Sequence, residues 1–374
     1  MPGFSLLWYL CYTDCIMIVQ IINTIVAIFL VLGALDYLLG GKLGLGPEFE
    51  RGFGCAAKLF LTMGGFVALA PVIARVLSPV VCPFFRSIGA DPSLFAGIFS
   101  GVDAGGLPLA LRLADDPAMG YFNGAIVGSM LGVALLCTIP LGIACTKPEE
   151  RPPMIYGLIC GLITIPAGCL AGGAVGGYGM TGVLKNTLPV IALSVVLSLL
   201  LLFAKDFIVR VLTVFGKCIL AIAVFGMVVS GLEFLLDRTI IEGMTSLQEV
   251  CTIIGQICIF IAGVFPLLAV IKRLANKPLT AASRKLSINE TACGDFLTTL
   301  ANSLPVLADL PLMDEKGRML NVAFATSACF VFGDHLAYLA AAAPEVSAAM
   351  IAAKLTAGFC GLALAIVLAP KLLK

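Results

Sequence analysis

Long apolar runs recur from one end of this sequence to the other, and each is about 20 residues or more. As a helix, such a run is long enough to cross the roughly 30 Å hydrocarbon core of a bilayer. The chain of 374 residues is 60% hydrophobic and only 12% charged, which is too little charge to cover a soluble surface. We therefore predict an all-α polytopic membrane protein embedded in a lipid bilayer. The net charge of +1 gives no reason to expect a nucleic-acid partner.

Eleven candidate segments follow one another without an intervening soluble domain. They lie at residues 16–39, 53–77, 93–113, 118–145, 152–178, 186–204, 211–236, 249–271, 291–312, 319–342 and 346–370. Residues 1–15 precede them as an N-terminal extension that lacks the basic start of a signal peptide.

Short strings repeat in the same order at an offset of about 195–200 residues. LDYLL at 35–39 returns as LEFLL at 232–236, and NGAIVGS at 123–129 returns as NVAFATS at 321–327. The constant offset predicts two repeats of about five segments. The boundaries we expect are a first membrane repeat at 16–185, a connecting helix at 186–210 and a second membrane repeat at 211–374.

The distribution of basic residues favours an inverted relation between the repeats. If all eleven segments span the membrane, lysines and arginines divide 11 to 9 between the two sides. If segments 93–113 and 291–312 are re-entrant hairpins, the division becomes 15 to 5, with Lys58, Lys217 and Lys354 left inside spans. The positive-inside rule favours the second arrangement, which leaves nine spanning helices and makes the repeats inverted, as in many transporters.

The two segments also have the sequence of hairpins. A polar, glycine-rich break, SGVDAGG, interrupts 93–113, and ANS followed by Pro305 interrupts 291–312. Such breaks occur at membrane depth only where protein or a wet cavity surrounds them. The alternative is a pair of kinked spanning helices.

Asp103 lies in the first break. A carboxylate at that depth costs about 2.5–3.5 kcal/mol on insertion scales, so a compensating group is required. The functional interpretation is a cation site, and the structural alternative is an ion pair with Arg112.

Asp334 and His335 lie in VFGDHLAYL, which contains the only histidine of the chain. Their counterparts in the first repeat, near Leu136 and Cys137, are apolar, so the pair departs from the repeat pattern. The preceding Gly333 permits a local break or close backbone approach. We expect Asp334 to bind a cation and to orient His335, with His335 as a donor or a proton-linked partner. The alternative is a self-satisfied pair that only packs.

Three further polar residues complete the candidate substrate-binding set: Asn302 and Ser303 at the second break, and Asn321 inside a span. Helix–helix hydrogen bonding would explain Asn321 equally well. No P-loop, HExxH motif or nucleophile elbow is present, and scattered cysteines with one histidine do not suggest zinc. We expect no catalytic residues, no metal site and no cofactor, hence no enzyme.

Several longer strings resemble one known family. GADPSLFAGIFSGVDAGG, TIPAGCLAGG, TLANSLP, MDEKGRMLNVAFATSACF and FGDHLAY are similar, in order and spacing, to the EutH family of ethanolamine-utilisation membrane proteins. The resemblance extends from about Asp14 to the C-terminus. Where the family pattern at the hairpin tip is close to ANNIP, this chain has ANSLP, which keeps a polar group at Ser303.

The resemblance implies ethanolamine import across the bacterial cytoplasmic (inner) membrane. Ethanolamine is mostly protonated at neutral pH, so we expect Asp103 and Asp334 to meet its ammonium, and Asn302 and Asn321 its hydroxyl. Alternating access between the hairpin tips is the expected motion, either passive or coupled to a proton through His335. Alternatives are a carrier for a nucleoside, amino acid or inorganic ion, a pore for the neutral amine, or a scaffold or sensor without flux. A homo-oligomer is compatible with all of these.

Overall fold

The computed structural model describes the backbone of residues 3–54 and 56–373, and most side chains from Gln20 onward. Every element within these ranges is helical. Eight helices are long and apolar enough to cross a membrane: Gln20–Leu38, Gly65–Ser87, Pro117–Thr138, Pro148–Val175, Met180–Phe203, Lys217–Leu236, Leu247–Ala275 and Pro344–Leu372. The prediction of an all-α polytopic membrane protein is confirmed.

The first half of the chain contains long helices separated by short ones. Its elements are α1 (Gly3–Leu38), α2 (Gly46–Gly54), α3 (Ala56–Leu59), η1 (Phe60–Gly64), α4 (Gly65–Ser87), α5 (Leu94–Phe99), η2 (Val102–Gly106), α6 (Leu107–Leu113), α7 (Pro117–Tyr121), η3 (Phe122–Gly132), η4 (Ala134–Thr138), α8 (Ile139–Ala144), η5 (Pro148–Glu150) and α9 (Arg151–Val175). Helix α1 begins at Gly3, so the backbone of the expected N-terminal extension continues into the first span. The side chains of residues 1–19 lie outside the described part.

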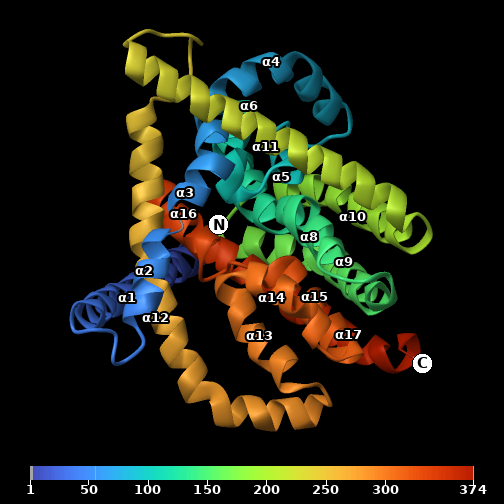
Figure 1. Ribbon diagram of the computed structural model, residues 1–374. Coiled ribbons are helices and arrows are strands. Elements are labelled where there is room, and N and C mark those ends of the chain that lie inside the picture. Colours follow the sequence, from blue (N-terminus) through green and yellow to red (C-terminus); the bar gives the residue numbers. More distant parts are fainter. Residues whose placement is uncertain (1–2, 55, 374) are drawn as a thin grey trace.

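The connecting helix α10 (Met180–Phe203) leads into a second series of similar order. This series consists of α11 (Lys205–Leu236), α12 (Leu247–Leu286), α13 (Glu290–Ala301), α14 (Ser303–Asp309), η6 (Leu310–Leu312), α15 (Glu315–Ala328), α16 (Asp334–Ala342), η7 (Pro344–Val346) and α17 (Ser347–Leu372). Figure 1 shows α12 extending along one side of the molecule, from the loop after α11 towards α13.

One expected span is broken in the structure. The sequence predicted a spanning segment over 319–342, in which Gly333 permits a local break. In the structure α15 ends at Ala328 and α16 begins at Asp334. Phe330 adopts a left-handed backbone with φ 60°, a conformation that a bulky residue rarely takes. The described residues therefore contain eight continuous candidate spanning helices, where nine spanning helices were expected. The ninth expected span is the discontinuous helix formed by α15 and α16.

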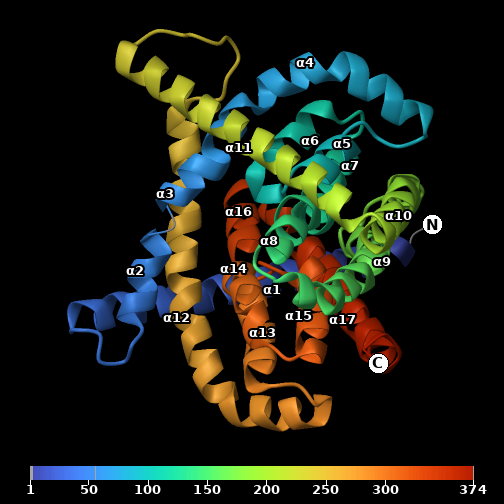
Figure 2. The same cartoon turned by 45° about the vertical axis from the view of Figure 1, so that its right-hand side comes forward.

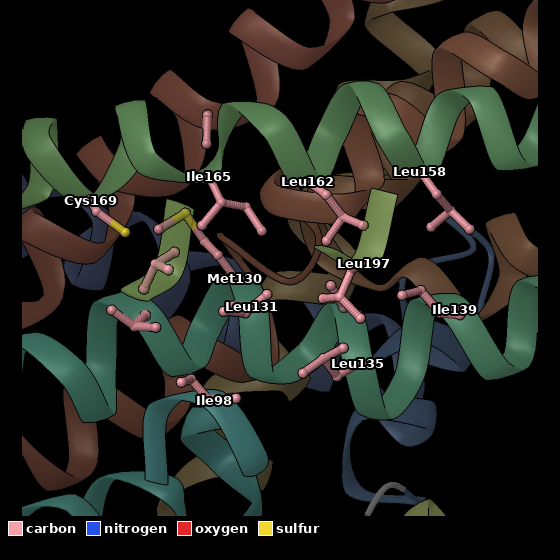
Figure 3. Packing of buried hydrophobic residues seen from close by; sticks show 14 of the residues in the cluster. Ile98, Met130, Leu131, Leu135, Ile139, Leu158, Leu162, Ile165, Cys169 and Leu197 are labelled. Atoms are coloured by element: carbon pink, nitrogen blue, oxygen red, sulfur yellow. The ribbon is translucent and has the colours of Figure 1, made fainter. Parts of the chain in front are cut away.

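The core joins the two halves of the chain. α9 packs against both α15 and α17, so the last long helix of the first half lies beside helices of the second (Figure 2). Figure 3 shows side chains of α9, including Leu158, Leu162 and Ile165, meeting Met130 and Leu135 of η3 and η4. This packing forms a common support for the two interrupted segments described below.

Two loops at corresponding positions are held in the same way. A carboxylate of Asp36, at the end of α1, accepts hydrogen bonds from the backbone of the following loop, including Leu43. Glu233, near the end of α11, accepts hydrogen bonds from Ile240 and Ile241 in its own following loop.

Each of these loops is also contacted by an arginine from the other half of the chain. Arg273 of α12 donates to the carbonyls of Leu43 and Gly44. Arg75 of α4 donates to the carbonyl of Glu242 at 3.1 Å. The contacts are thus reciprocal between the two halves.

Candidate functional site

The first interrupted segment begins and ends at one place. The carboxylate of Asp91, just before α5, accepts hydrogen bonds from the backbone N–H groups of Asp115 and Asp116, just after α6, at 3.2 and 3.1 Å. α5 and α6 therefore form an out-and-back unit whose base is fastened by Asp91. Its tip is the non-helical stretch around η2.

The second interrupted segment is closed in a comparable way. Asn289, just before α13, donates its backbone N–H to Asp314 Oδ1 at 2.8 Å and its side-chain amide to the Leu312 carbonyl at 2.8 Å. The chain thus returns after α14 and η6 to the point where α13 began. Its tip is at Asn302, between α13 and α14.

The first tip is shaped by small residues. Ser100 and Gly101 are extended, and Gly105 has φ 82°, so helix geometry is lost on both sides of Asp103. A Cβ at Gly105 would lie 2.2 Å from Cδ1 of Phe66. Glycine is therefore required here both by the backbone angle and by the neighbouring ring.

The second tip is fastened to the break between α15 and α16. The backbone N–H of Phe330 donates to the Thr299 carbonyl at 3.0 Å, and that of Phe332 donates to the Leu300 carbonyl at 2.8 Å. These bonds pair backbone groups that the broken helix leaves open, as burial in a membrane protein demands. A Cβ at Gly333 would lie 1.8 Å from the Ala301 carbonyl oxygen, so this contact admits only glycine.

The first tip also lies next to the break between α15 and α16, because its Asp103 faces His335 of α16. His335, in the first turn of α16, places Nε2 3.7 Å from Oδ1 of Asp103. The side chain of His335 is 1% exposed while that of Asp103 is 26% exposed, so the carboxylate retains access to open space. Neither ring nitrogen of His335 has a hydrogen-bond partner among the described residues. The two ring nitrogens of His335 are therefore available as hydrogen-bond donors or acceptors, next to the partly accessible carboxylate of Asp103.

Lys354 is the residue that the sequence analysis left without a role. Its side chain is fully buried on α17 and donates a hydrogen bond to the Ser129 carbonyl of η3. Its charge also interacts with that of Asp103. The available signal was a lone charge inside the apolar run 346–370, which by default marks a functional position.

The expected partners of the acidic residues differ from those in the structure. Arg112 is exposed, and Asp103 faces His335 rather than Arg112. His335 in turn faces Asp103 of the first hairpin. Asp334 lies beside them as the first residue of α16 and is partly buried.

Asn302 and Ser303 lie at the second tip, as expected. Ser303 is fully buried, and its hydroxyl has no hydrogen-bond partner within the described part of the chain. Asn302 follows the last residue of α13 and lines a small cavity together with Arg51 and Lys272. Polar groups from the second tip are thus available near the break that Gly333 anchors.

Asn321 lies at the other end of the second hairpin. Its amide nitrogen donates to the carbonyls of Ala292 and Gly317, at 2.7 and 3.0 Å. Ala292 is at the start of α13, a helix of 12 residues and therefore about 18 Å long. Only Oδ1 of Asn321 remains without a partner among described residues, so the residue mainly fastens the hairpin base.

Nothing in the described residues suggests a metal centre. No group of three or more His, Cys, Asp or Glu side chains there is arranged to hold a metal ion. The chemistry of the site is that of charge and hydrogen bonding: the carboxylates of Asp103 and Asp334, the imidazole of His335, the amine of Lys354 and nearby neutral polar groups.

Buried ionisable groups at broken helices, inside a bundle of membrane-spanning helices, are typical of transporter substrate sites. The fold and the site thus define a membrane transporter. Residues 18–368 match the family described as "Ethanolamine utilisation protein, EutH", and the chain belongs to this family.

Curated relatives cover nearly the whole chain. It is 40% identical over 355 residues to the "Probable ethanolamine permease EutH" of Listeria monocytogenes, with 95% of each chain covered. It is 33% identical over 390 residues to the protein of that name in Escherichia coli, covering 94% of this chain and 96% of the relative. An "Uncharacterized protein YxeR" of Bacillus subtilis is 40% identical over 334 residues, covering 89% and 90%. No solved structure matches the chain.

These relatives are bacterial and are named permeases, not enzymes, where a function is given. Together with the eight candidate spans, they identify a multi-pass transporter of the bacterial inner membrane.

Proposed function

We propose that this protein imports ethanolamine across the bacterial cytoplasmic membrane, and that the substrate binds where the two tips meet the α15–α16 break. The observation that carries the proposal is the partly accessible Asp103 carboxylate facing the buried His335 at a broken helix. Its relatives in Listeria monocytogenes and Escherichia coli bear the name "Probable ethanolamine permease EutH".

Ethanolamine has an ammonium at one end and a hydroxyl at the other, and the site offers a match for each. Asp103 and Asp334 bind the ammonium, since a carboxylate is the strongest partner for a buried cation. His335 accepts from or donates to the substrate through a ring nitrogen that is otherwise unpaired. The hydroxyl is met by Asn302 or Ser303 at the second tip, whereas Asn321, at the base of that hairpin, lies too far from the tip to take part.

We further propose that α5–α6 and α13–α14 are re-entrant hairpins in the membrane. This is supported by the hydrogen bonds of Asp91 with Asp115 and Asp116, and of Asn289 with Asp314, because each brings the two ends of a segment to one side. The equivalent residues in the two bases stand about 198 positions apart in the sequence, as a structural repeat requires.

The proposal that the repeats are inverted rests on the two similarly held loops. The loop after α11 directly precedes Leu247, where α12 begins, whereas Arg273, far along α12, contacts the loop after α1. The membrane-crossing part of α12 has 29 residues and is about 43 Å long. If α12 spans the bilayer, the two loops lie on opposite sides, as Figure 1 lets the reader follow.

In the proposed mechanism, movement of the hairpin tips against the break exposes the site first to one side and then to the other. Such alternating access around a site between inverted repeats is a general transporter plan. The backbone bonds of Phe330 and Phe332 to the second tip would have to exchange or move with it.

Uptake of labelled ethanolamine into proteoliposomes tests the proposed function. We expect saturable uptake that excess unlabelled ethanolamine blocks and that serine, adenosine or potassium leaves unchanged. Inhibition by one of these solutes alone would assign the carrier to another substrate. Non-saturating flux would indicate a pore, and uptake equal to that of empty liposomes would contradict transport.

A further inference from the structure

Lys354 adds a positive charge to the proposed site. This charge would repel a cationic substrate. Its side chain has no exposed surface, and it donates a hydrogen bond to the Ser129 carbonyl, a neutral acceptor. Its charge interacts with Asp103, Cys329 and His335. Among these groups Asp103 is a carboxylate, so it offsets part of the positive charge of Lys354.

The titratable groups around Lys354 come from three elements. Asp103 is on η2, His335 and Tyr338 are on α16, and Cys329 lies in the break. Asp334, at the start of α16, acts on Cys329. Asp103 is a carboxylate whose charge interacts with that of Lys354.

Ethanolammonium bound at Asp103 would bring a second positive charge to a carboxylate that already interacts with Lys354, and two neighbouring cations repel each other. In a medium of low dielectric constant, an uncompensated charge costs several kcal/mol. The cost is avoided if one of the two cations becomes neutral. Lys354 can do so without losing its position, because a neutral amine still donates an N–H to the Ser129 carbonyl.

We propose that Lys354 and the substrate ammonium take turns as the cation at Asp103, so that binding of ethanolammonium releases one proton from Lys354. This rests on the proposed function. An N–H bond of the Lys354 ammonium breaks, its electron pair stays on Nζ, and the proton leaves to bulk water. On substrate release, Lys354 takes up a proton again. Import of one ethanolammonium is thereby coupled to export of one proton, and transport is electroneutral.

Proton release on binding is the first test. Ethanolamine hydrochloride is added to purified protein in detergent, in weakly buffered solution at pH 7.5 with an indicator dye, and binding is measured in parallel with labelled ethanolamine. We expect about one proton released per bound substrate in the wild type. Lys354→Met, whose unbranched side chain is one atom shorter and uncharged, should bind without releasing a proton.

Lys354→Arg separates proton exchange from a purely structural role. Arginine keeps the charge and can donate to Ser129 but does not deprotonate in proteins, so we expect at least a tenfold loss of ethanolamine binding. Wild-type binding and proton release in Lys354→Arg would overturn the inference.

A membrane potential provides the second test, in proteoliposomes with a potassium gradient and valinomycin. At 100 mV, inside negative, a transported charge is worth about 2.3 kcal/mol, which is about 50-fold in the equilibrium accumulation ratio. When the potential is applied, the accumulation ratio of the wild type should change by less than twofold. The accumulation ratio of Lys354→Met should rise by nearly 50-fold.

The outcomes separate the two proposals. Binding without proton release, or about 50-fold accumulation by the wild type, overturns the exchange but leaves ethanolamine transport standing. Absence of binding and uptake in the wild type overturns ethanolamine transport and the exchange with it. If neither Lys354 variant folds, the wild-type measurements alone decide.

Discussion

At the scale of single residues, the centre of the site is assembled from distant parts of the sequence. Asp103 and His335 were both recognised as expensive ionisable groups in apolar surroundings, but each was assigned a partner close in sequence. Adjacent positions on a helix do not face each other, whereas Asp103, from a distant segment, lies 3.7 Å from the imidazole of His335. The meeting of Asp103 and His335 is a tertiary contact, which no local pattern encodes.

Replacement of Asp334 tests whether the acidic residue beside His335 serves the substrate or only packing. We expect Asp334→Asn to fold and to lose saturable ethanolamine uptake, because the amide removes the charge that binds the ammonium while keeping the volume. Thermal unfolding and initial uptake rates are the two measurements. Asp237→Asn, an exposed residue in a left-handed turn that asparagine also tolerates, is the control. Wild-type uptake by Asp334→Asn would mean that Asp334 has a structural role.

The glycine before this pair should be intolerant of even one methyl group. Gly333→Ala places a Cβ 1.8 Å from the Ala301 carbonyl oxygen, so the tip and the break must separate. We expect a loss of about 1–3 kcal/mol in stability and a lower thermal midpoint. Gly294→Ala, on the same hairpin with nothing within 4 Å of its added Cβ, should match or slightly exceed the wild type. Equal midpoints for the wild type and Gly333→Ala would contradict the close contact described here.

At the scale of elements, the two polar breaks could be predicted, but the broken span could not. Glycine-rich and proline-flanked interruptions are visible in the sequence at Asp103 and at Asn302. Over 319–342 the composition is largely apolar despite Asn321, Asp334 and His335. A hydropathy pattern does not show that the backbones of Phe330 and Phe332 donate to carbonyls of α13. The break depends on a partner segment, and its only local sign is Gly333.

The base of the first hairpin supplies a prediction about stability. Asp91→Ala leaves the backbone N–H groups of Asp115 and Asp116 without their acceptor, at a cost of about 1–3 kcal/mol for a buried donor. Because these groups are partly exposed to water, we expect the lower end of that range as a reduced thermal midpoint. Glu242→Ala, which removes an exposed carboxylate from another loop, should leave the midpoint unchanged. An unchanged midpoint in Asp91→Ala would show that this side chain does not hold the base together.

Sided labelling tests the hairpins themselves. In a background without native cysteines, single cysteines replace Ser87 and Pro117 around the first hairpin, and Glu290 and Glu315 around the second, all at exposed positions. A membrane-impermeant maleimide should reach Ser87→Cys and Pro117→Cys from one side of the membrane, and Glu290→Cys and Glu315→Cys from the other. Labelling of the two members of either pair from opposite sides would contradict re-entrance.

At the scale of the whole molecule, the sequence predicted the membrane class and the family resemblance, since both depend on composition and on motif order. It also predicted a repeat, which stays a prediction; the reciprocal contacts of Arg75 and Arg273 with the opposite loops are the observation behind the proposal of inverted repeats. The role of Lys354 was not predicted, because a hydropathy pattern gives its depth but not its partners. Its significance appears only once η3 and the first tip are placed beside α17.

The central claim is that ethanolamine is carried through a site containing Asp103. The measurement to make is the initial rate of labelled ethanolamine uptake into proteoliposomes over a range of substrate concentrations, for the wild type, Asp103→Asn and Asp237→Asn. We predict saturable uptake by the wild type and by Asp237→Asn, and at least a hundredfold lower rate at limiting substrate for folded Asp103→Asn. Saturable uptake by Asp103→Asn at the wild-type rate would contradict the assignment of the site.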